Sequence, residues 1–188
     1  MADDVDSLAA LAISRRRFLQ AVGAGLVLAP LGAALARVAP TRSLSFVHTH
    51  TGERFSVGYC SDGVYQADCL TQLNHFLRDF RTGEIHAIDP RLLDILYDLQ
   101  LRADREFTFE VISGYRSPQT NAALHQLSHE VAVHSLHMVG QAIDIRASGF
   151  STRKLHDVAL RQQTGGIGFY AASDFVHLDT GRIRTWVG

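Results

Sequence analysis

The sequence has few cysteines, no internal repeats and none of the common cofactor-binding motifs. It has only two cysteines, Cys60 and Cys69, in 188 residues, which excludes a disulfide framework and a zinc site built from thiolates alone. In an oxidising compartment these thiols either pair or remain as free side chains. The chain also lacks internal repeats, low-complexity linkers and the dinucleotide-binding, P-loop and haem-attachment motifs. Its length leaves room for one ordinary domain.

An excess of charge of one sign is also missing. The chain has 18 basic and 19 acidic residues, so its formal net charge is −1. Residues 1–36 carry three arginines and three aspartates, so the remainder also has a net charge of −1. Binding to nucleic acid depends on a concentrated basic surface, and we therefore expect no nucleic-acid partner.

The N-terminal segment lacks an apolar run long enough to predict a membrane span. Basic residues precede a modest apolar stretch at 21–32 that Gly and Pro interrupt, which is the layout of an export signal. The run Ser14-Arg15-Arg16-Arg17-Phe18-Leu19-Gln20 resembles the twin-arginine motif, Ser/Thr-Arg-Arg-x-Phe-Leu-Lys, at every position except Gln20. Ala34-Leu35-Ala36 has the pattern of a cleavage site.

We therefore expect two parts, a twin-arginine signal at 1–36 and a folded domain at 37–188. The Tat export machinery would be one partner, and the domain would reach the periplasm. Contact with the membrane would be transient, through the signal, unless the segment stays uncleaved as an anchor. This route carries folded proteins, which suits a protein that acquires a metal before export.

Apolar periodicity predicts an α+β domain. Helices come early and strands cluster late, which favours a central antiparallel sheet flanked by helices. Helices are predicted at 64–80, from Pro90, from Pro118 to about Leu127, and from Ser151, and strands at 43–50, 53–59, 107–112, 141–146, 165–170 and 175–179.

Two of these strands carry polar side chains typical of a metal site. His137 precedes Asp144 by seven residues, and Gly140 allows a sharp turn between them. An acidic side chain in the apolar strand 141–146 is costly to bury without a partner. In the strand 175–179, alternation places His177 and Asp179 on one face.

Two imidazoles and one carboxylate, with a fourth position left to water, are the ligands of a catalytic zinc site. His137, Asp144 and His177 would supply them, and zinc would lower the pKa of the bound water to roughly 7. The alternative is a pair of core histidines with a structural aspartate.

These motifs resemble those of the zinc peptidases of family M15, the D-alanyl-D-alanine carboxypeptidase group. The resemblance is greatest to the DUF882/YcbK-like branch of murein endopeptidases, and it covers the whole predicted domain. Further segments that carry it are 73–80, Ile112-Ser113-Gly114-Tyr115-Arg116-Ser117, Gly165-Gly166-x-Gly168-Phe169-Tyr170, and Phe175-Val176-His177-x-Asp179-Thr180-Gly181 with Arg184 and Trp186.

The resemblance implies a hedgehog/DD-peptidase-like fold and a zinc peptidase that acts on peptidoglycan stem peptides or their cross-links. His137, Asp144 and His177 would bind Zn²⁺, and Arg116 would hold an oxyanion or a substrate carboxylate. Two other functions stay open: a carboxypeptidase that trims terminal D-alanine, and a non-catalytic domain that binds zinc and the cell wall.

One departure from the family concerns the general base. Carboxypeptidase members have Glu-x-x-His, where this chain has Asp174-Phe175-Val176-His177. Asp174 is therefore the preferred candidate for the base, although its side chain is one methylene shorter. Asp179 is the rival, either as the base or as a partner that orients a histidine.

The other histidines have simpler explanations. His48 and His50 alternate on the first predicted strand and are expected at the surface. His134 lies three residues before His137, and it either lines the same cleft or, as we expect, is a solvated loop residue.

Overall fold

The computed structural model describes residues 40–128 and 131–188, so the predicted signal at 1–36 lies outside the described residues. The strands are β1 (Arg42–His48), β2 (Arg54–Ser61), β3 (Val64–Tyr65), β4 (Thr108–Ser113), β5 (Ala142–Ala147), β6 (Gly166–Tyr170), β7 (Phe175–Asp179) and β8 (Arg184–Val187). The helices are α2 (Ala67–Phe76), α3 (Pro90–Arg102), α4 (Pro118–Leu127), α5 (Thr152–Leu160) and a short 3-10 helix, η1 (Leu136–Val139).

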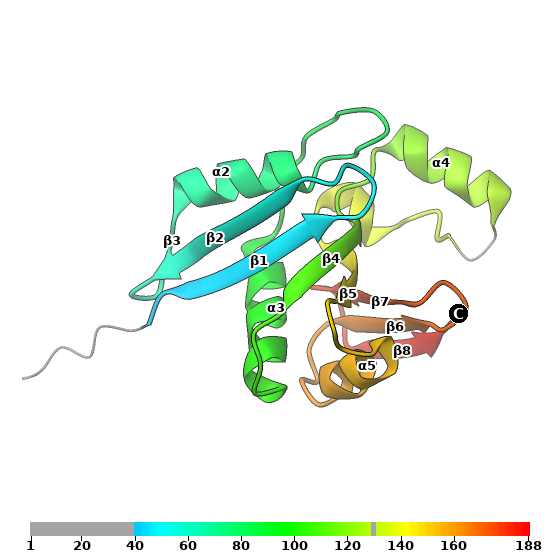
Figure 1. Cartoon of the computed structure of the whole chain (residues 1–188). Coiled ribbons are helices and arrows are strands. Elements are labelled where there is room, and N and C mark those ends of the chain that lie inside the picture. Colours follow the sequence, from blue (N-terminus) through cyan, green and yellow to red (C-terminus); the bar gives the residue numbers. More distant parts are fainter. Residues whose placement is uncertain (1–39, 129–130) are drawn as a thin grey trace, which may run out of the picture. The chain divides into compact units, whose positions relative to one another are not determined.

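These strands form one open sheet in the order β3-β2-β1-β4-β5-β7-β6-β8 (Figure 1). The α+β class is thereby confirmed, but the sheet is mixed rather than antiparallel. β1 pairs with β4, and β6 with β8, in parallel. The first parallel pair follows from its long connection, which includes α2 and α3 and returns the chain to the end where β1 starts.

The predicted helix starts depend on capping side chains. Asp89 accepts a hydrogen bond from the backbone N–H of Arg91 at the start of α3, and Pro90 follows it in the first turn. Ser117 and Ser151 cap α4 and α5 in the same way. The first helix begins later than predicted, at Ala67, because residues 64 and 65 pair with β2 as the short strand β3.

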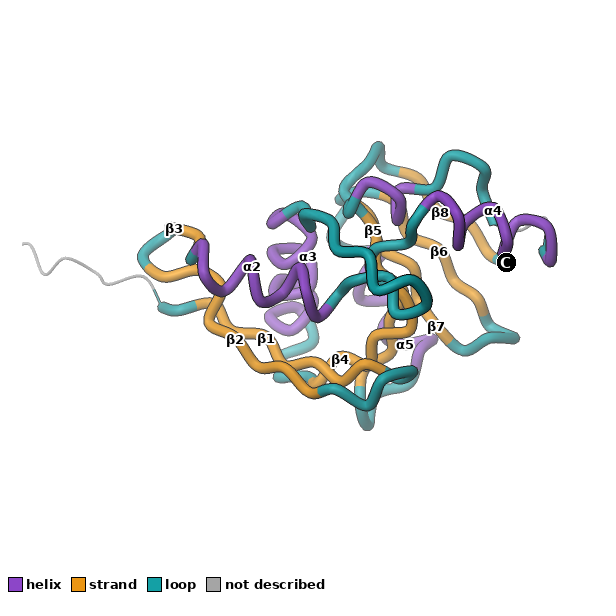
Figure 2. The backbone as a smooth tube through the Cα atoms, turned by 90° about the horizontal axis from the view of Figure 1, so that it is seen from above, coloured by secondary structure: helices purple, strands orange, loops and turns teal. Residues whose placement is uncertain are grey.

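The helices and the sheet enclose one apolar core. α2 packs against β2, α3 against β1 and α5, and α5 against β5, β6 and β7, and Figure 2 shows α2 and α3 along one side of β1 and β2. Ile143 and Ile145 of β5 are fully buried in this core. Because side chains alternate along a strand, Asp144 projects from the opposite face of the sheet. The fold therefore presents the polar residues of β5 and β7 away from the helical layer.

The prediction that His48 lies at the surface is wrong. His48 follows Leu44 and Phe46 at every second position of β1, and its side chain is buried with theirs at 1% exposure. The rings of Phe76 and Phe80 pack edge-on against it. The helix α2 and the loop after it cover this face of the hairpin, so the buried face of β1 continues from Leu44 and Phe46 to His48.

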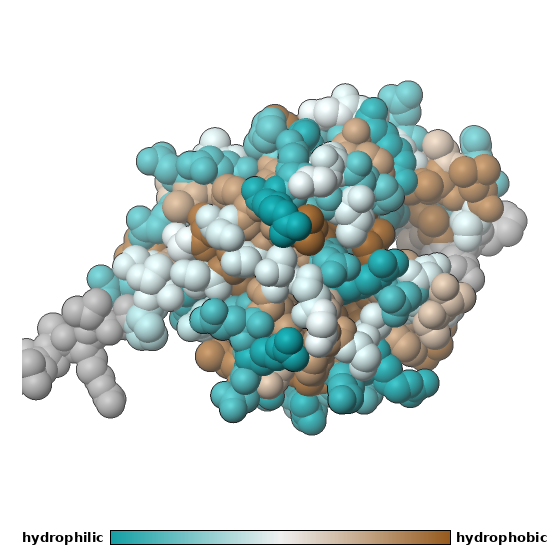
Figure 3. Space-filling view, in the orientation of Figure 1, coloured by the Kyte–Doolittle hydropathy of each residue, from teal (hydrophilic) through white to brown (hydrophobic). Residues whose placement is uncertain are grey.

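The described surface is mixed in character. On the face shown in Figure 3, hydrophobic side chains form small patches separated by hydrophilic ones. None of the helices in the described residues has both the length and the apolar content needed to cross a membrane. Cys60 and Cys69 are free thiols, Cys60 being buried in the core.

Candidate active site

The polar residues of β5 and β7 meet across two paired strands. The antiparallel register places Asp144 opposite His177 and Ala142 opposite Asp179. Directly opposed residues of a pair have neighbouring side chains on the same face. The small side chain of Ala142 leaves room beside Asp144.

His137 reaches the same place from η1, just before β5. Ser135 caps this 3-10 helix, and Gly140 ends it with a left-handed backbone, φ 66°. A β-carbon at Gly140 would lie 2.1 Å from the carbonyl oxygen of Ala87, so a side chain at this position is excluded. The turn therefore directs the chain into β5 with His137 facing Asp144.

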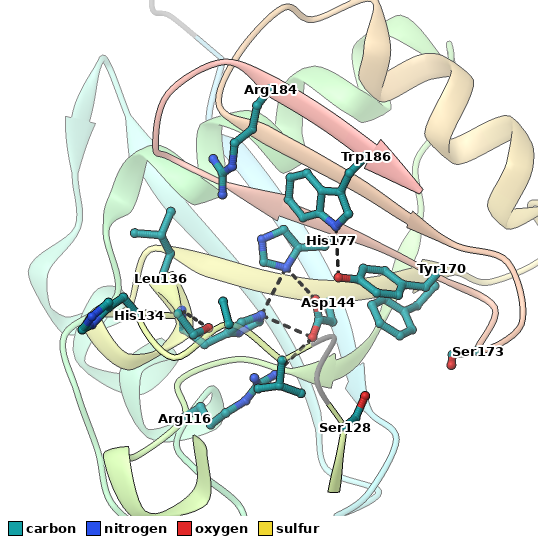
Figure 4. A pocket seen from close by; sticks show the side chains of 15 residues that line it. Arg116, Ser128, His134, Leu136, Asp144, Tyr170, Ser173, His177, Arg184 and Trp186 are labelled. Atoms are coloured by element: carbon teal, nitrogen blue, oxygen red, sulfur yellow. Dashed lines mark hydrogen bonds and ion pairs between the residues drawn. The ribbon is translucent and has the colours of Figure 1, made fainter. Parts of the chain in front are cut away.

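The three predicted ligands converge in the structure (Figure 4). Nε2 of His137 lies 3.2 Å from Nδ1 of His177 and 3.3 Å from the nearer oxygen of Asp144. Nδ1 of His177 is 2.9 Å from the other oxygen of Asp144. Among the described residues these are the one group of three such side chains whose ligand atoms all lie within 4.8 Å of one another, and all three are buried.

The outer nitrogens of both imidazoles are held by acceptors. Nδ1 of His137 lies 2.7 Å from the carbonyl oxygen of Gly114, and Nε2 of His177 lies 3.1 Å from a carboxylate oxygen of Asp179. A carbonyl and a carboxylate only accept hydrogen bonds, so each outer nitrogen carries the hydrogen. In the neutral imidazoles the inner nitrogens then present lone pairs to each other and to Asp144.

Three lone-pair donors in a buried space repel one another unless a cation lies between them. A proton on His177 would serve one of these contacts, whereas a metal ion would accept all three donors. Two imidazole nitrogens and one carboxylate are a ligand set that zinc binds. The chemistry of the donors therefore fits a zinc ion.

The carboxylates of the cluster also favour positive charge, although burial lowers the pKa of His137. Burial alone would raise the pKa of Asp144, but His137 and His177 outweigh it and lower that pKa well below its usual range. Burial likewise would lower the pKa of His177, but its hydrogen bonds to Asp144 and Asp179 raise it. The same carboxylates would stabilise a cation at the centre of the cluster.

Asp179 is completely buried and saturated with donors. It accepts hydrogen bonds from the backbone N–H groups of Gly166 and Gly181, at 2.9 and 2.8 Å, and from both terminal nitrogens of Arg184, at 3.1 and 2.6 Å. Burial would raise its pKa, but the bonds from His177 and Arg184 lower it. It contacts the outer nitrogen of His177, on the side away from Asp144.

The structure does not bring Asp174 into the cluster. Asp174 ends the turn between β6 and β7, with φ 53°, and its side chain is 65% exposed. One carboxylate oxygen lies 3.6 Å from Nε of Arg146, whose Nε also donates to the carbonyl oxygen of Asp174. Its two chain neighbours, Ser173 and Phe175, line the cleft, but Asp174 is not one of the lining residues.

Arg116 lies beside the cluster, in the loop between β4 and α4. One terminal nitrogen is 3.5 Å from Asp144 and 3.3 Å from the hydroxyl of Ser113. The other is 3.4 Å from the amide oxygen of Asn121, and the buried Nε has no partner among the described residues. Burial lowers the pKa of this guanidinium. Arg116 therefore places a positive charge beside the three clustered side chains.

An open cleft of about 220 Å³ leads to these groups. The metal-ligand candidates and Arg116 line it, and His134 stands at its edge as an exposed side chain. The sequence had assigned no role to two further lining residues, Tyr170 and Trp186. Trp186 reaches the cleft because Gly168 makes room for its ring: a β-carbon at Gly168 would lie 2.5 Å from the indole.

Comparison with known proteins identifies the family. The model of the family described as "Peptidoglycan L,D-endopeptidase MepK" matches residues 36–186. The protein of that name from Escherichia coli strain K12 is 39% identical over 177 residues, which are 92% of this chain and 97% of the relative. The "Probable peptidoglycan L,D-endopeptidase MepK" of Haemophilus influenzae is 39% identical over 148 residues, 78% of this chain and 80% of the relative.

No solved structure matches the chain significantly. The family model spans nearly all of the described domain, including each of the three clustered side chains. The resemblance inferred from the sequence motifs is thereby confirmed, and this chain belongs to the M15-type peptidase family of the peptidoglycan L,D-endopeptidase MepK.

Proposed function

We propose that this chain is an exported, zinc-dependent endopeptidase that hydrolyses peptide cross-links between peptidoglycan stem peptides. The names of its relatives support peptidoglycan hydrolysis and point to a bond of the L,D type. Its substrates would be stem peptides and their cross-links, and its place of action the periplasm. Cutting cross-links would permit growth or remodelling of the wall.

One observation carries the metal dependence. The inner nitrogens of His137 and His177 and the carboxylate of Asp144 face one another, while acceptors on the outer side hold both rings in place. Such outer partners are what fix the orientation of metal-binding histidines in proteins. A zinc ion bound here supplies a Lewis acid and activates water as a nucleophile near neutral pH.

The chain's own residues would bind and orient the substrate around that centre. Arg116 is positioned to hold negative charge, because it lines the cleft beside Asp144 and its guanidinium is always charged. A fixed cation in a partly buried site stabilises a developing oxyanion or a substrate carboxylate.

We assign different roles to Asp174 and Asp179. Both carboxylate oxygens of Asp179 are already in hydrogen bonds, to Gly166, His177 and Arg184. We therefore assign Asp179 to holding His177. We keep Asp174 as the proton acceptor, since only an exposed ion pair with Arg146 restrains its carboxylate. Such pairs contribute about 0–1 kcal/mol, so this one breaks at little cost.

Digestion of purified sacculi with the zinc-loaded protein tests the function. Loss of cross-linked dimers with a gain of monomers, absent in His137→Ala, would support an endopeptidase and identify the bond that is cut. Release of free D-alanine without loss of dimers would indicate a carboxypeptidase instead. Sacculi that bind the folded, zinc-loaded protein and stay unchanged would indicate a binding domain.

Export by the twin-arginine route is tested separately. Replacing Arg15 and Arg16 with lysine keeps the charge of the signal but removes the paired arginines. We expect the variant to accumulate in the cytoplasm, as measured by cell fractionation. A variant that still reaches the periplasm would contradict this route.

A further inference from the structure

Tyr170 has a hydroxyl group that its packing does not account for. Its ring, at the end of β6, stacks on that of Phe175, with 4.5 Å between centroids and 16° between planes. A phenylalanine would pack equally well there. The hydroxyl instead lines the cleft and accepts a hydrogen bond of 3.0 Å from the indole Nε1 of Trp186.

This hydrogen bond determines what the hydroxyl can do. An indole N–H only donates, so the phenol oxygen is the acceptor and its own hydrogen must point elsewhere. Among the described residues this hydroxyl donates no hydrogen bond and accepts only the one from Trp186. The phenol therefore has a free donor, and its oxygen is held in place by Trp186.

The hydroxyl of Tyr170 lies beside the three candidate metal ligands. The ring of Trp186 is 5.2 Å from that of His177, and Figure 4 shows the Tyr170 hydroxyl turned toward Trp186, His177 and Asp144. Arg116 and Tyr170 both line this cleft. The cleft thus has a cationic donor in Arg116 and a neutral donor in Tyr170.

The position of Trp186 is itself fixed. Its ring lies against Gly168, where no β-carbon could fit, and the guanidinium of Arg184 lies 5.0 Å from the ring centre. Arg184 is in turn paired with Asp179. The hydroxyl of Tyr170 is therefore tied, through Trp186 and Arg184, to the same group that holds His177.

We propose that Tyr170 is a catalytic residue, which donates a hydrogen bond to the carbonyl oxygen of the scissile peptide as negative charge develops on it, and that Trp186 is the positioning residue that orients this donor. The inference rests on the proposed peptidase function. It needs no change of covalent bonds at Tyr170, because the phenol keeps its proton.

The test uses the full chain loaded with zinc and a purified cross-linked muropeptide dimer. Tyr170→Phe keeps the ring and its stacking on Phe175 but removes the donor. Loss of one such donor in other enzymes lowers kcat about 100- to 1,000-fold. Because Arg116 would share the role, we expect kcat to fall about 10- to 100-fold, with KM, zinc content and Tm little changed.

Binding gives a readout apart from turnover. A peptide with a phosphinate in place of the scissile amide carries a tetrahedral, anionic group. Tyr170→Phe should weaken its binding by about the same factor as kcat falls, while the KM of the dimer stays within about twofold. Tyr97→Phe is the matched control, since Tyr97 lies outside the cleft.

A double-mutant cycle tests the role of Trp186. Trp186→Phe should lower kcat about 3- to 10-fold, and Tyr170→Phe with Trp186→Phe should be no slower than Tyr170→Phe alone, because Trp186 acts through the hydroxyl. The proposal is overturned if Tyr170→Phe keeps kcat within twofold, if it loses zinc, or if the two losses add. A wild-type protein inactive in the same assay would overturn the proposed function instead.

Discussion

Two pairs of histidines lie close together in this domain, and their surroundings differ. The rings of His137 and His177 are 5.0 Å apart, and those of His48 and His50 are 5.9 Å apart. The distance between the rings is therefore similar in the two pairs. Their partners do.

The first pair is surrounded by carboxylates and fixed acceptors, and the second by aromatic rings. His48 packs edge-on against Phe76 and Phe80, and His50 stacks on Phe80 at 4.1 Å. Nε2 of His48 is buried without a partner among the described residues. Two neighbouring imidazoles become a candidate metal site only when a carboxylate completes the ligand set and outer acceptors fix both rings.

The largest effect is expected from a substitution that removes one histidine of the first pair. His137→Ala should abolish stoichiometric zinc binding and lower activity by more than about 1,000-fold, because two ligands rarely retain a catalytic zinc. Metal content by mass spectrometry and dimer cleavage measure both. His50→Ala, which removes an exposed imidazole of the second pair, should retain zinc and activity. Zinc bound equally by both variants would refute the comparison.

The next prediction concerns proton transfer beside the first pair. Asp174→Asn should lower kcat by about 100-fold with zinc content unchanged, since general-base catalysis contributes about 100- to 10,000-fold. Arg146→Gln, which removes the ion-pair partner and its hydrogen bonds to the carbonyl oxygens of Ser173 and Asp174 but keeps the carboxylate, should stay near wild-type activity. Near-normal kcat in Asp174→Asn would show that another group accepts the proton.

A smaller effect is expected from the outer acceptor of His177. Asp179→Asn keeps the size of the side chain but removes the charge that orients the imidazole. Loss of such a partner lowers metal affinity about 10- to 100-fold, so zinc should dissociate at lower chelator concentrations. At saturating zinc, most of kcat should return. Loss of kcat that excess zinc does not restore would assign Asp179 a direct role in the chemistry.

The smallest effect belongs to the second pair and depends on pH. Burial lowers the pKa of His48 from 6.5 to about 4, so the unfolded chain binds a proton more readily than the folded one between these values. The free energy of unfolding should therefore fall as the pH drops below about 6.5, by on the order of 1–2 kcal/mol at pH 5. Urea titrations at pH 7.5 and 5 measure the fall, and His48→Gln should reduce it. An equal fall in both proteins would mean that other groups are responsible.

Much of the candidate site could be predicted from local sequence. Strand alternation alone placed His177 and Asp179 on one face, and the register confirms that Asp144 and His177 are neighbours. The same rule, applied to Leu44, Phe46 and His48, would have predicted that His48 is buried. Its polar character suggested the surface, whereas the continuing apolar face was the better indicator.

Features that depend on distant segments could not be predicted in this way. β8 has only four residues, too few for a reliable strand prediction, and it pairs in parallel with β6. Without β8, nothing in the sequence places Trp186 beside Tyr170 or Arg184 beside Asp179. The parallel pairing of β1 with β4 was missed because hairpins and late strands suggested an antiparallel sheet, although the helices between them imply a crossover.

The glycines that precede and begin β6 limit which sequences this domain tolerates. A β-carbon at Gly165 would lie 1.7 Å from the carbonyl oxygen of Asp179, and one at Gly166 would lie 2.3 Å from its carboxylate and 2.4 Å from Arg184. Even alanine at these positions must displace the group that holds His177. A saturation mutagenesis screen for wall hydrolysis should therefore find two intolerant positions that touch neither metal nor substrate, and a designer who grafts this site must transplant backbone as well as side chains.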